Sequence, residues 1–375
     1  MVNTSRKITF FTPSFTSTGS EIVLCNMLNS LNPTISAKLV SYYSGGSLWN
    51  KLTKNYSKNS LYHFNPQKGI FARIFHRLEK TFLVPKKLKK YTNSVWYINT
   101  IVLPEILEFA AANGIRTIVH SHEMEHMFNL LSTQQLKQLI QYPELIIANS
   151  AASEKVLNEL GRTNKIKRIY PAIKSLAIQR DTVAYSNFRK KLGIGSTEKL
   201  WVMCGTLDSN KNPELFIQTA KLVLEAANNY KFMWIGGSDD TAYTAAIHQI
   251  AKENNLTEKI NWTGNLGDEY LNYFNCADGF MLCSKKESFS MVTIEALLLG
   301  IPVVANNCGG VLEILEGGLG KITTSSTEMA EAILHFEKEN YVPNFEAIRQ
   351  RVSKFDTSKI VIEWNKLLNE FFDNK

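Results

Sequence analysis

The chain has 375 residues, a formal net charge of +8 and 44% hydrophobic residues, which is the composition of a folded globular protein. This length exceeds what one ordinary core holds, so it predicts two domains. No stretch approaches the roughly 18 apolar residues of a membrane span, and the first residues lack the apolar segment of a signal peptide. Five cysteines without a C-x-x-C pair predict reduced core thiols of a cytosolic protein, and argue against a zinc ribbon.

Most of the excess positive charge lies in one segment. Residues 66–96 contain eight Lys and Arg against one Glu, hence +7 of the total +8. This distribution argues against a general nucleic-acid-binding protein and indicates one local basic patch. Residues 70–82 place apolar side chains on one side of a predicted helix and Arg or Lys on the other. Two alternatives follow: this helix lies on an anionic membrane surface, or it packs on its own sheet and turns a charged face to solvent.

The first half of the chain alternates strands and helices, which is typical of a doubly wound α/β domain. Its predicted strands are 7–12, 96–100, 117–120, 145–149 and 166–170. The first strand leads into a loop that contains Thr18 and Gly19, and Glu21 opens the next helix. No G-x-G-x-x-G follows any strand, so the fingerprint of dinucleotide binding is absent.

A histidine-rich motif follows the third of these strands. The sequence HEMEH from His122 to His126 fits the zinc-protease pattern, but that pattern needs both histidines on one face of an established helix. Here the first histidine comes directly after a strand, which argues against a metalloprotease. Doubly wound sheets present ligand-facing residues at the carboxyl ends of their strands. We therefore interpret His122 as such a residue, with His120 as the rival and a purely structural role as the alternative.

The second half repeats the alternation after a connection over residues 172–196. Its predicted strands are 200–204, 232–235, 260–263, 279–283 and 301–305. The first of them leads into a loop that begins at Gly205 and contains Lys211. A lone loop lysine is usually solvated, so spacing alone assigns Lys211 no function.

The stretch 287–313 is the most informative part of the sequence. A loop leads into a helix over residues 291–299, Gly300 stops it, and a buried strand and a Gly-rich turn follow. The helix start offers N–H groups and a partial positive charge, which suit a diphosphate on the backbone of Ser288, Phe289, Ser290, Met291 and Val292. Glu287 and Glu295 would repel phosphate, but they can accept hydrogen bonds from sugar hydroxyls. The pattern predicts a pocket for a nucleotide-sugar.

The E-x7-E spacing, the strand GIPVVA and the turn NCGGVLE resemble the donor-site signature of retaining GT-B glycosyltransferases of family 4, glycosyl transferases group 1. The resemblance implies an α/β fold with two doubly wound, Rossmann-like domains that face each other across a cleft. Residues 1–171 would form the acceptor-side domain and 172–355 the donor-binding domain. Residues 356–375 would form a C-terminal helix that crosses back to the first domain.

The resemblance also implies roles for individual residues. Glu287 would contact the donor sugar and Glu295 the ribose, while residues 288–292 hold the diphosphate. Gly205 and Lys211 would join the diphosphate site, and Gly19 the loop of the first domain. His122 would lie near the transferred group. The sequence departs from the family pattern at Thr206, where an Arg is expected, at Thr18, where a second Gly is expected, and at Ser290 in place of Gly.

The function implied is transfer of a sugar from a nucleotide diphosphate donor, UDP-linked in our expectation, to a hydroxyl of a glycan, lipid-linked or protein-linked acceptor. The anomeric configuration would be retained, in cell-surface polysaccharide assembly. No metal or cofactor is expected, and the location would be cytoplasmic or peripheral on the inner face of the plasma membrane. The non-enzyme alternative is a GT-B subunit that serves as a scaffold for a partner transferase. A hydrolase with Glu287 and Glu295 as its carboxylate pair leaves Lys211 without a use.

Overall fold

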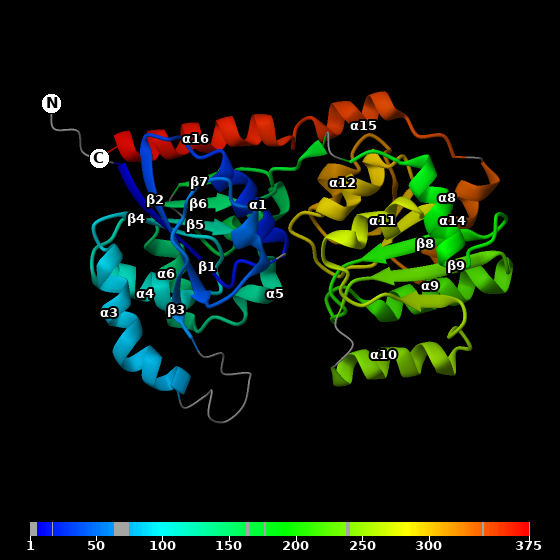
Figure 1. Cartoon of the computed structure of the whole chain (residues 1–375), viewed down its shortest axis with the longest axis horizontal. Helices are drawn as coiled ribbons and strands as arrows, with labels where there is room; N and C mark the ends of the chain where they lie inside the picture. Colours follow the sequence, from blue (N-terminus) through cyan, green and yellow to red (C-terminus); the bar gives the residue numbers. More distant parts are fainter. Residues whose placement is uncertain are drawn as a thin grey trace. The chain divides into compact units, whose positions relative to one another are not determined.

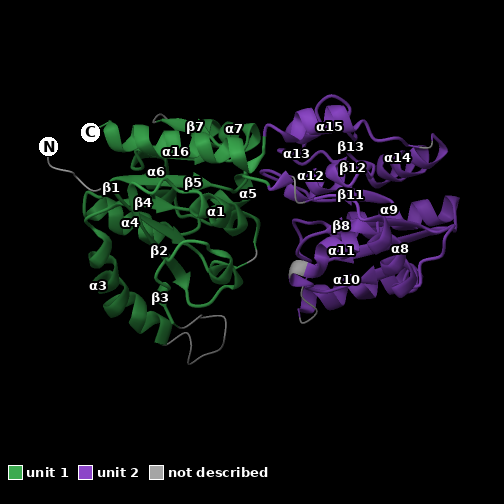
Figure 2. Ribbon diagram, turned by 45° about the horizontal axis from the view of Figure 1, so that its top comes forward, with its two compact units in different colours: residues 1–173, 355–375 green, residues 174–354 purple. Residues whose placement is uncertain are grey.

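The computed structural model describes residues 6–16, 18–63, 75–162, 165–175, 178–237, 241–339 and 341–374. The chain divides into two compact units, residues 1–173 with 355–375 and residues 174–354, coloured green and purple in Figure 2. Each unit has its own parallel sheet. The division into an acceptor-side and a donor-side domain stays a prediction.

Unit 1 is built on a parallel sheet with the strand order β3-β2-β1-β4-β5-β6-β7. The strands are β1 (Arg6–Thr12), β2 (Ile35–Tyr43), β3 (Asn59–Tyr62), β4 (Val95–Ile98), β5 (Thr117–Ser121), β6 (Leu145–Ala148) and β7 (Ile166–Arg168). The central strands β4, β5 and β6 are buried along their whole length. In β4 and β6 this burial appears in the sequence as a continuous apolar run, as in parallel strands covered on both faces, whereas β5 also buries the polar residues Thr117, His120 and Ser121.

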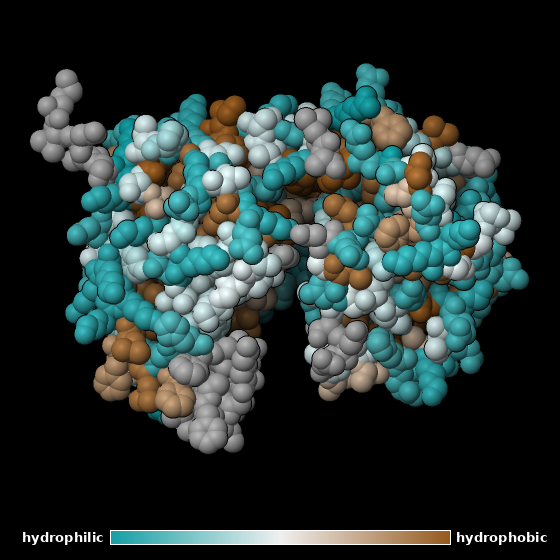
Figure 3. Space-filling model, viewed as in Figure 1, coloured by the Kyte–Doolittle hydropathy of each residue, from teal (hydrophilic) through white to brown (hydrophobic). Residues whose placement is uncertain are grey.

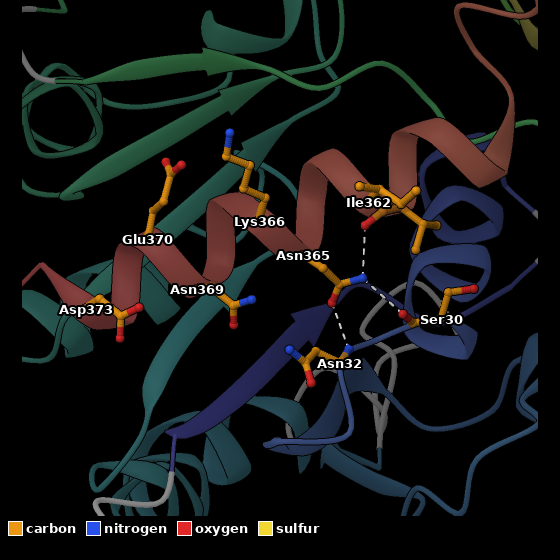
Figure 4. A pocket seen from close by; sticks show the side chains of 9 residues that line it. Ser30, Asn32, Ile362, Asn365, Lys366, Asn369, Glu370 and Asp373 are labelled. Carbon is orange, nitrogen blue, oxygen red and sulfur yellow. Dashed lines mark hydrogen bonds between the residues drawn. The ribbon is translucent and has the colours of Figure 1, made fainter.

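Helices cover the sheet of unit 1 (Figure 1). They are α1 (Gly19–Asn29), α3 (Val84–Leu88), α4 (Pro104–Ala112), α5 (Glu125–Phe128), α6 (Thr133–Gln141), α7 (Ala151–Glu159) and α16 (Thr357–Asp373), with the short helical turns η1 (Ser47–Lys51), η3 (Glu79–Leu83) and η4 (Lys89–Tyr91). The last helix, α16, packs on α1 although all of unit 2 precedes it in the chain. Its Asn365 accepts from the backbone N–H of Asn32 at 2.7 Å and donates to the carbonyl of Ser30 at 3.0 Å, beside a shallow groove (Figure 4).

Unit 2 has a second parallel sheet with the order β10-β9-β8-β11-β12-β13. Its strands are β8 (Lys199–Cys204), β9 (Tyr230–Ile235), β10 (Ile260–Trp262), β11 (Gly279–Leu282), β12 (Val303–Asn306) and β13 (Lys321–Thr323). Its helices are α8 (Thr182–Lys191), α9 (Pro213–Ala226), α10 (Ala242–Glu253), α11 (Tyr270–Asn275), α12 (Met291–Leu298), α13 (Val311–Ile314), α14 (Ser326–Lys338) and α15 (Phe345–Val352), with the turn η6 (Gly267–Glu269). The two doubly wound α/β sheets predicted from the sequence are confirmed.

Each sheet has one point where the strand order reverses. In unit 1 the chain adds β2 and β3 on one side of β1 and then returns to its other side with β4. In unit 2 the same reversal separates β8 from β11. Side chains at the carboxyl ends of the two strands that flank such a reversal line the usual ligand crevice of an open α/β sheet. The candidate site residues lie on segments that follow the strands at or beside these two reversals.

The helical segment before β4 leaves its apolar side exposed as well as its basic residues Arg77 and Lys80. Phe75, Leu78 and Phe82 are 47%, 48% and 67% exposed, whereas Glu79 is only 3% exposed. Glu79 accepts from the backbone N–H of His63 at 3.0 Å. The alternative in which the apolar side packs on the sheet is therefore wrong for the described part of the segment. Figure 3 shows apolar side chains gathered at this end of unit 1. Residues 66–74 of the predicted basic segment lie outside the described residues.

Candidate functional site

The first part of the site is the loop after β8 in unit 2. Its backbone at Gly205 is approached closely by Gly236, which follows the neighbouring strand β9, because a Cβ on Gly236 would lie 2.6 Å from the carbonyl oxygen of Gly205. The indole N–H of Trp234 donates to the same oxygen at 3.1 Å. Asp208 then shapes the loop, since one of its carboxylate oxygens accepts the backbone N–H groups of Asn210 and Lys211 at 2.9 and 3.0 Å. The aliphatic stem of Lys211 crosses Gly205, where a Cβ would lie 3.2 Å from Cε.

Lys211 forms an ion pair with Glu287, which follows β11. Its Nζ lies 2.5 Å from Oε1 of Glu287, and Ser284 donates its hydroxyl to the same oxygen at 2.7 Å. The two side chains are 22% and 11% exposed. Burial acts to lower the pKa of Lys211, but the carboxylates of Glu287 and Asp208 outweigh it, and the pKa is raised. The structure thus brings together a predicted phosphate-binding cation and a predicted sugar-binding carboxylate, at the strand-order reversal of unit 2.

Glu295 is a buried carboxylate on α12 with an unsatisfied oxygen. The residue is 8% exposed, and the hydroxyl of Tyr270 donates to Oε1 at 2.9 Å. Oε2 has no hydrogen-bond partner in the described structure. Burial raises the pKa of Glu295 to about 7, against the bond from Tyr270. The pKa of the nearby Cys204 thiol is raised, first by burial and then by Glu295, while Lys211 acts to lower it. Glu287, Glu295 and Lys211 therefore lie close together around Cys204.

Gly310, in the turn after β12, packs against the backbone of the loop before α12. A Cβ on Gly310 would lie 1.9 Å from the carbonyl oxygen of Ser288, so no other residue fits there without moving the loop. Gly310 also donates its N–H to the carbonyl of Glu287 at 2.8 Å, and Glu287 donates to the carbonyl of Cys308 at 2.6 Å. Ser290 is the N-cap residue of α12, but its side chain makes no cap bond and instead accepts from Thr293 at 2.8 Å.

Thr206, at the position where an Arg was expected, supplies no charge. The residue is exposed, and its hydroxyl donates to Asp208 at 2.5 Å. Lys285 and Lys286 are both exposed and next to Glu287 in sequence. Asn210 ties their backbone to the β8 loop, because its carbonyl accepts from the N–H of Lys285 at 2.7 Å and its side chain donates to the carbonyl of Lys286 at 3.0 Å.

The loop after β1 in unit 1 is organised by Glu21, which the sequence analysis placed only at a helix start. Glu21 is 1% exposed. Its carboxylate accepts from hydroxyl and backbone N–H groups at 2.7 to 3.2 Å, and these donors belong to Thr12, Ser14, Phe15, Thr16 and Thr18. Phe15 has a φ of 53°, which is unfavourable for a bulky side chain. The loop that leads to Gly19 is thus tied to one buried carboxylate.

His122 lies directly after β5, and several groups fix its place. Its backbone N–H donates to Oε2 of Glu123 at 2.7 Å, and its Nε2 lies 3.1 Å from Oδ1 of Asn99. The ring lies against that of His120, with centroids 4.0 Å apart and the ring planes tilted by 38°. Burial lowers the pKa of His122 to about 3, and it raises the pKa of Glu123. His126 lies on the short helix α5, so the HEMEH sequence does not place both histidines on one established helix.

The predicted residues thus fall into two groups. Gly19 and His122 lie in unit 1, Gly19 as the first residue of α1 after the β1 loop and His122 directly after β5. Gly205, Lys211, Glu287, Glu295 and the loop 288–292 lie in unit 2, around the strand-order reversal between β8 and β11. Sequence reasoning missed Glu21 and Asn99 as organisers of the first group.

Comparison with known proteins agrees with this geometry. The family model described as glycosyl transferases group 1 matches residues 185–354. A relative in Campylobacter jejuni is 25% identical over 97% of this chain and 98% of its own length, and is named GalNAc-alpha-(1->4)-GalNAc-alpha-(1->3)-diNAcBac-PP-undecaprenol alpha-1,4-N-acetyl-D-galactosaminyltransferase. N-acetyl-alpha-D-glucosaminyl L-malate synthase of Bacillus anthracis is 25% identical over 61% of this chain and 60% of its own.

Among solved structures, HepE of Anabaena in complex with UDP and glucose superimposes with a TM-score of 0.80 at 20% identity, covering 99% of this chain and all of that one. The pneumococcal O-GlcNAc transferase GtfA in complex with UDP and GlcNAc gives 0.72 at 12% identity, covering 98% and 99%. These structural likenesses establish the fold. The match to glycosyl transferases of group 1 covers residues 185–354, within unit 2, and the chain has the GT-B fold.

Proposed function

We propose that this glycosyltransferase moves a sugar from a UDP-sugar donor to an acceptor hydroxyl with retention of the anomeric configuration. The observation that carries the proposal is the buried carboxylate of Glu295, whose Oε2 is unsatisfied in the described structure, near the pair Lys211–Glu287. A buried acceptor without a partner is costly, so it indicates a ligand with hydroxyl donors. The ribose of a nucleotide supplies such donors. The solved structures of HepE and GtfA with UDP support the choice of nucleotide.

In this proposal the leaving diphosphate is stabilised by fixed positive groups, which is an electrostatic task. The first N–H groups of α12 and the ammonium of Lys211 would face it. Lysine has three donors, so Lys211 can keep its bond to Glu287 and still donate to phosphate. Glu287 would then accept from a hydroxyl of the donor sugar, and a donor phosphate oxygen would take the acceptor proton. The reaction in this form needs no metal ion.

We further propose that the acceptor is a lipid-linked or other cell-surface glycan. The name of the Campylobacter relative includes an undecaprenol-linked glycan. The exposed side chains of Phe75, Leu78, Phe82 and Leu83 offer an apolar surface, and the exposed Lys86, Lys89 and Lys90 follow it. Such a combination suits an anionic membrane surface. None of the helices within the described ranges has the length and hydropathy that crossing a membrane requires. A cytoplasmic location with peripheral contact on the inner face of the plasma membrane would agree with this proposal.

One observation favours a second candidate function, a non-catalytic GT-B subunit that acts as a scaffold for a partner transferase. Thr206 leaves the diphosphate site with one cation fewer than the family pattern has, and a poorly compensated buried charge is costly. Donor binding with turnover separates the two functions. A scaffold would bind nucleotide weakly or not at all, and would release no UDP.

The test is a thermal-shift screen of the purified protein with UDP, GDP, ADP and their common sugars, in the presence of EDTA. We expect UDP to raise the melting temperature, because a ligand at a hundred times its Kd stabilises the folded protein by about 2.7 kcal/mol. Lys211→Ala should abolish the shift and lower UDP release from the matching UDP-sugar by about 100-fold. Lys221→Ala, an exposed lysine on α9, is the matched control. No shift with any nucleotide would favour the scaffold, whereas equal UDP shifts and equal turnover in the two variants would refute the assignment of Lys211 to the donor site.

A further inference from the structure

A buried asparagine joins three loops at the strand-order reversal of unit 1. Asn99 follows β4 and is fully buried. Its side-chain nitrogen Nδ2 donates to the carbonyl oxygen of Ser20, in the first turn of α1, at 3.2 Å. Its Oδ1 lies 3.1 Å from Nε2 of His122, after β5. One amide therefore bridges the start of α1 and the candidate histidine, which lie about a hundred residues apart in the chain.

The donors and acceptors of this bridge determine where the proton of His122 sits. The carbonyl of Ser20 can only accept, so the NH₂ group of Asn99 must face it. The amide oxygen of Asn99 then faces His122, and it too can only accept. Nε2 of His122 must therefore carry the hydrogen, which leaves Nδ1 as the acceptor atom of the neutral ring. The orientation of the Asn99 amide is assigned from its hydrogen-bond partners, because the oxygen and nitrogen atoms of an amide have similar shapes and are otherwise hard to distinguish.

The surroundings keep the ring neutral. The ring of His120 lies against it, and Nδ1 of His120 is 2.7 Å from the hydroxyl of Tyr97. Burial lowers the pKa of both histidines. The carboxylate of Glu123 is the nearby acid, but it accepts from the backbone N–H of His122 and of Ile101 and from the hydroxyl of Thr100. A neutral ring with a fixed tautomer suits a hydrogen-bond acceptor for a sugar hydroxyl.

We propose that Asn99 is a positioning residue that holds His122 as the neutral tautomer protonated at Nε2, so that Nδ1 accepts a hydrogen bond from a hydroxyl of the bound sugar. The amide also makes the orientation of the ring depend on the first turn of α1. The chemical class of the ligand rests on the proposed function. The tautomer rests on the geometry of unit 1 alone.

The test reads the tautomer directly in the full chain. Long-range proton–nitrogen NMR spectra of protein labelled with ¹⁵N-histidine distinguish the Nε2–H form, the Nδ1–H form and the imidazolium, and His122→Asn assigns the signal. We expect the Nε2–H form in the wild type at pH 7. Asn99→Leu, of similar volume, should yield a mixture of tautomers. Asn113→Leu, at the exposed end of α4, should leave the signal unchanged. An Nδ1–H form in the wild type, or an unchanged signal in Asn99→Leu, would overturn the proposal.

A second arm separates this proposal from the function on which its ligand depends. The amide of Asn lies where Nδ1 of His lies, whereas the amide of Gln reaches the place of Nε2. We therefore expect His122→Asn to keep at least tenfold more UDP-sugar turnover than His122→Gln, and the reverse order would refute the role of Nδ1. Asn99→Asp, which keeps an acceptor for Nε2–H, should hold the Nε2–H tautomer that Asn99→Leu loses. A wild type that shows the Nε2–H form but no UDP binding would contradict the proposed function and leave the position of the proton standing.

Discussion

Glu295 has the clearest pH dependence among the candidate site residues. Burial raises its pKa to about 7, so between the unfolded value near 4.5 and pH 7 the folded protein holds a proton that the unfolded chain loses. Its contribution to stability is full below about pH 4.5 and is lost as the pH rises through 7. Glu295→Gln lacks this titration. We expect the stability of this variant relative to the wild type to be greater at pH 8 than at pH 4.5, by about 1–3 kcal/mol.

Urea unfolding of both proteins between pH 4.5 and 8 would measure the difference. Glu225→Gln, an exposed position on α9, is the control and should follow the wild type throughout. The ionisation of Glu295 should also affect the binding of UDP, because the carboxylate accepts hydrogen bonds from ribose hydroxyls better than the protonated acid does. UDP affinity should rise as the pH rises through 7 in the wild type but not in Glu295→Gln. Parallel stability curves for the variant and the wild type would contradict the assigned burial of the charge.

The residues that sequence reasoning found and those it missed differ in one physical respect. Glu295 stands out because a carboxylate within an apolar helix has no local explanation, and that conflict is visible in the sequence. Asn99 and Glu21 show no such conflict, since Asn and Glu are ordinary after a strand and at a helix start. Their importance comes from partners that only the strand order brings near. The pair between Lys211 and Glu287 was likewise invisible, because both residues were assigned to the ligand and not to each other.

At the scale of elements, burial explains only part of what could be predicted. The central strands of both sheets are buried, and they were recognisable to within a few residues. The strands β2, β3 and β13 were not predicted, and in β13 two of the three residues, Lys321 and Ile322, are exposed. For the helix before β4, periodicity revealed two faces but not which one packs. The inward face is fixed by a specific polar partner, because the buried Glu79 accepts from the backbone N–H of His63.

The exposed apolar face of this element leads to a prediction about membrane contact. Phe82→Ser should reduce binding to vesicles that contain anionic lipid by about tenfold or more, because a Phe side chain gains about 1.5–3 kcal/mol when it leaves water. Its effect on stability should stay within about 0.5 kcal/mol, since the residue is 67% exposed. Lys89→Gln should cost about 1 kcal/mol of vesicle binding, and only at low salt.

Vesicle sedimentation measures both effects. Ile362→Ser on α16 is the matched control, because Ile362 is 71% exposed and lies on another element of the same unit. Wild-type protein that stays in the supernatant with anionic vesicles would refute the membrane surface. Equal losses in Phe82→Ser and Ile362→Ser would show that exposed apolar area in general, and not this face, drives the binding.

At the scale of the whole molecule, the two units differ in how the chain builds them. Unit 2 is one continuous segment, whereas unit 1 needs α16 from the far end of the chain. Trp364 of α16 is fully buried, with its ring centroid 6.0 Å from that of Phe10 and 6.1 Å from that of Tyr97. Its indole N–H donates to the hydroxyl of Tyr97 at 3.2 Å. The last residues of the chain thus complete the core under the first strand.

We therefore expect calorimetry to resolve two unfolding transitions, each governed by the core of one unit. Trp364→Ala should lower only the transition of unit 1, since losing a buried Trp costs about 3–5 kcal/mol, on the order of 10 °C for a unit of this size. Trp234→Ala, which removes an equally buried indole from β9, should lower only the other transition. UDP should raise the transition that Trp234→Ala lowers, because the proposed donor site lies in unit 2. A single transition that both variants lower equally would mean that the two units unfold together, and that α16 stabilises the molecule as a whole.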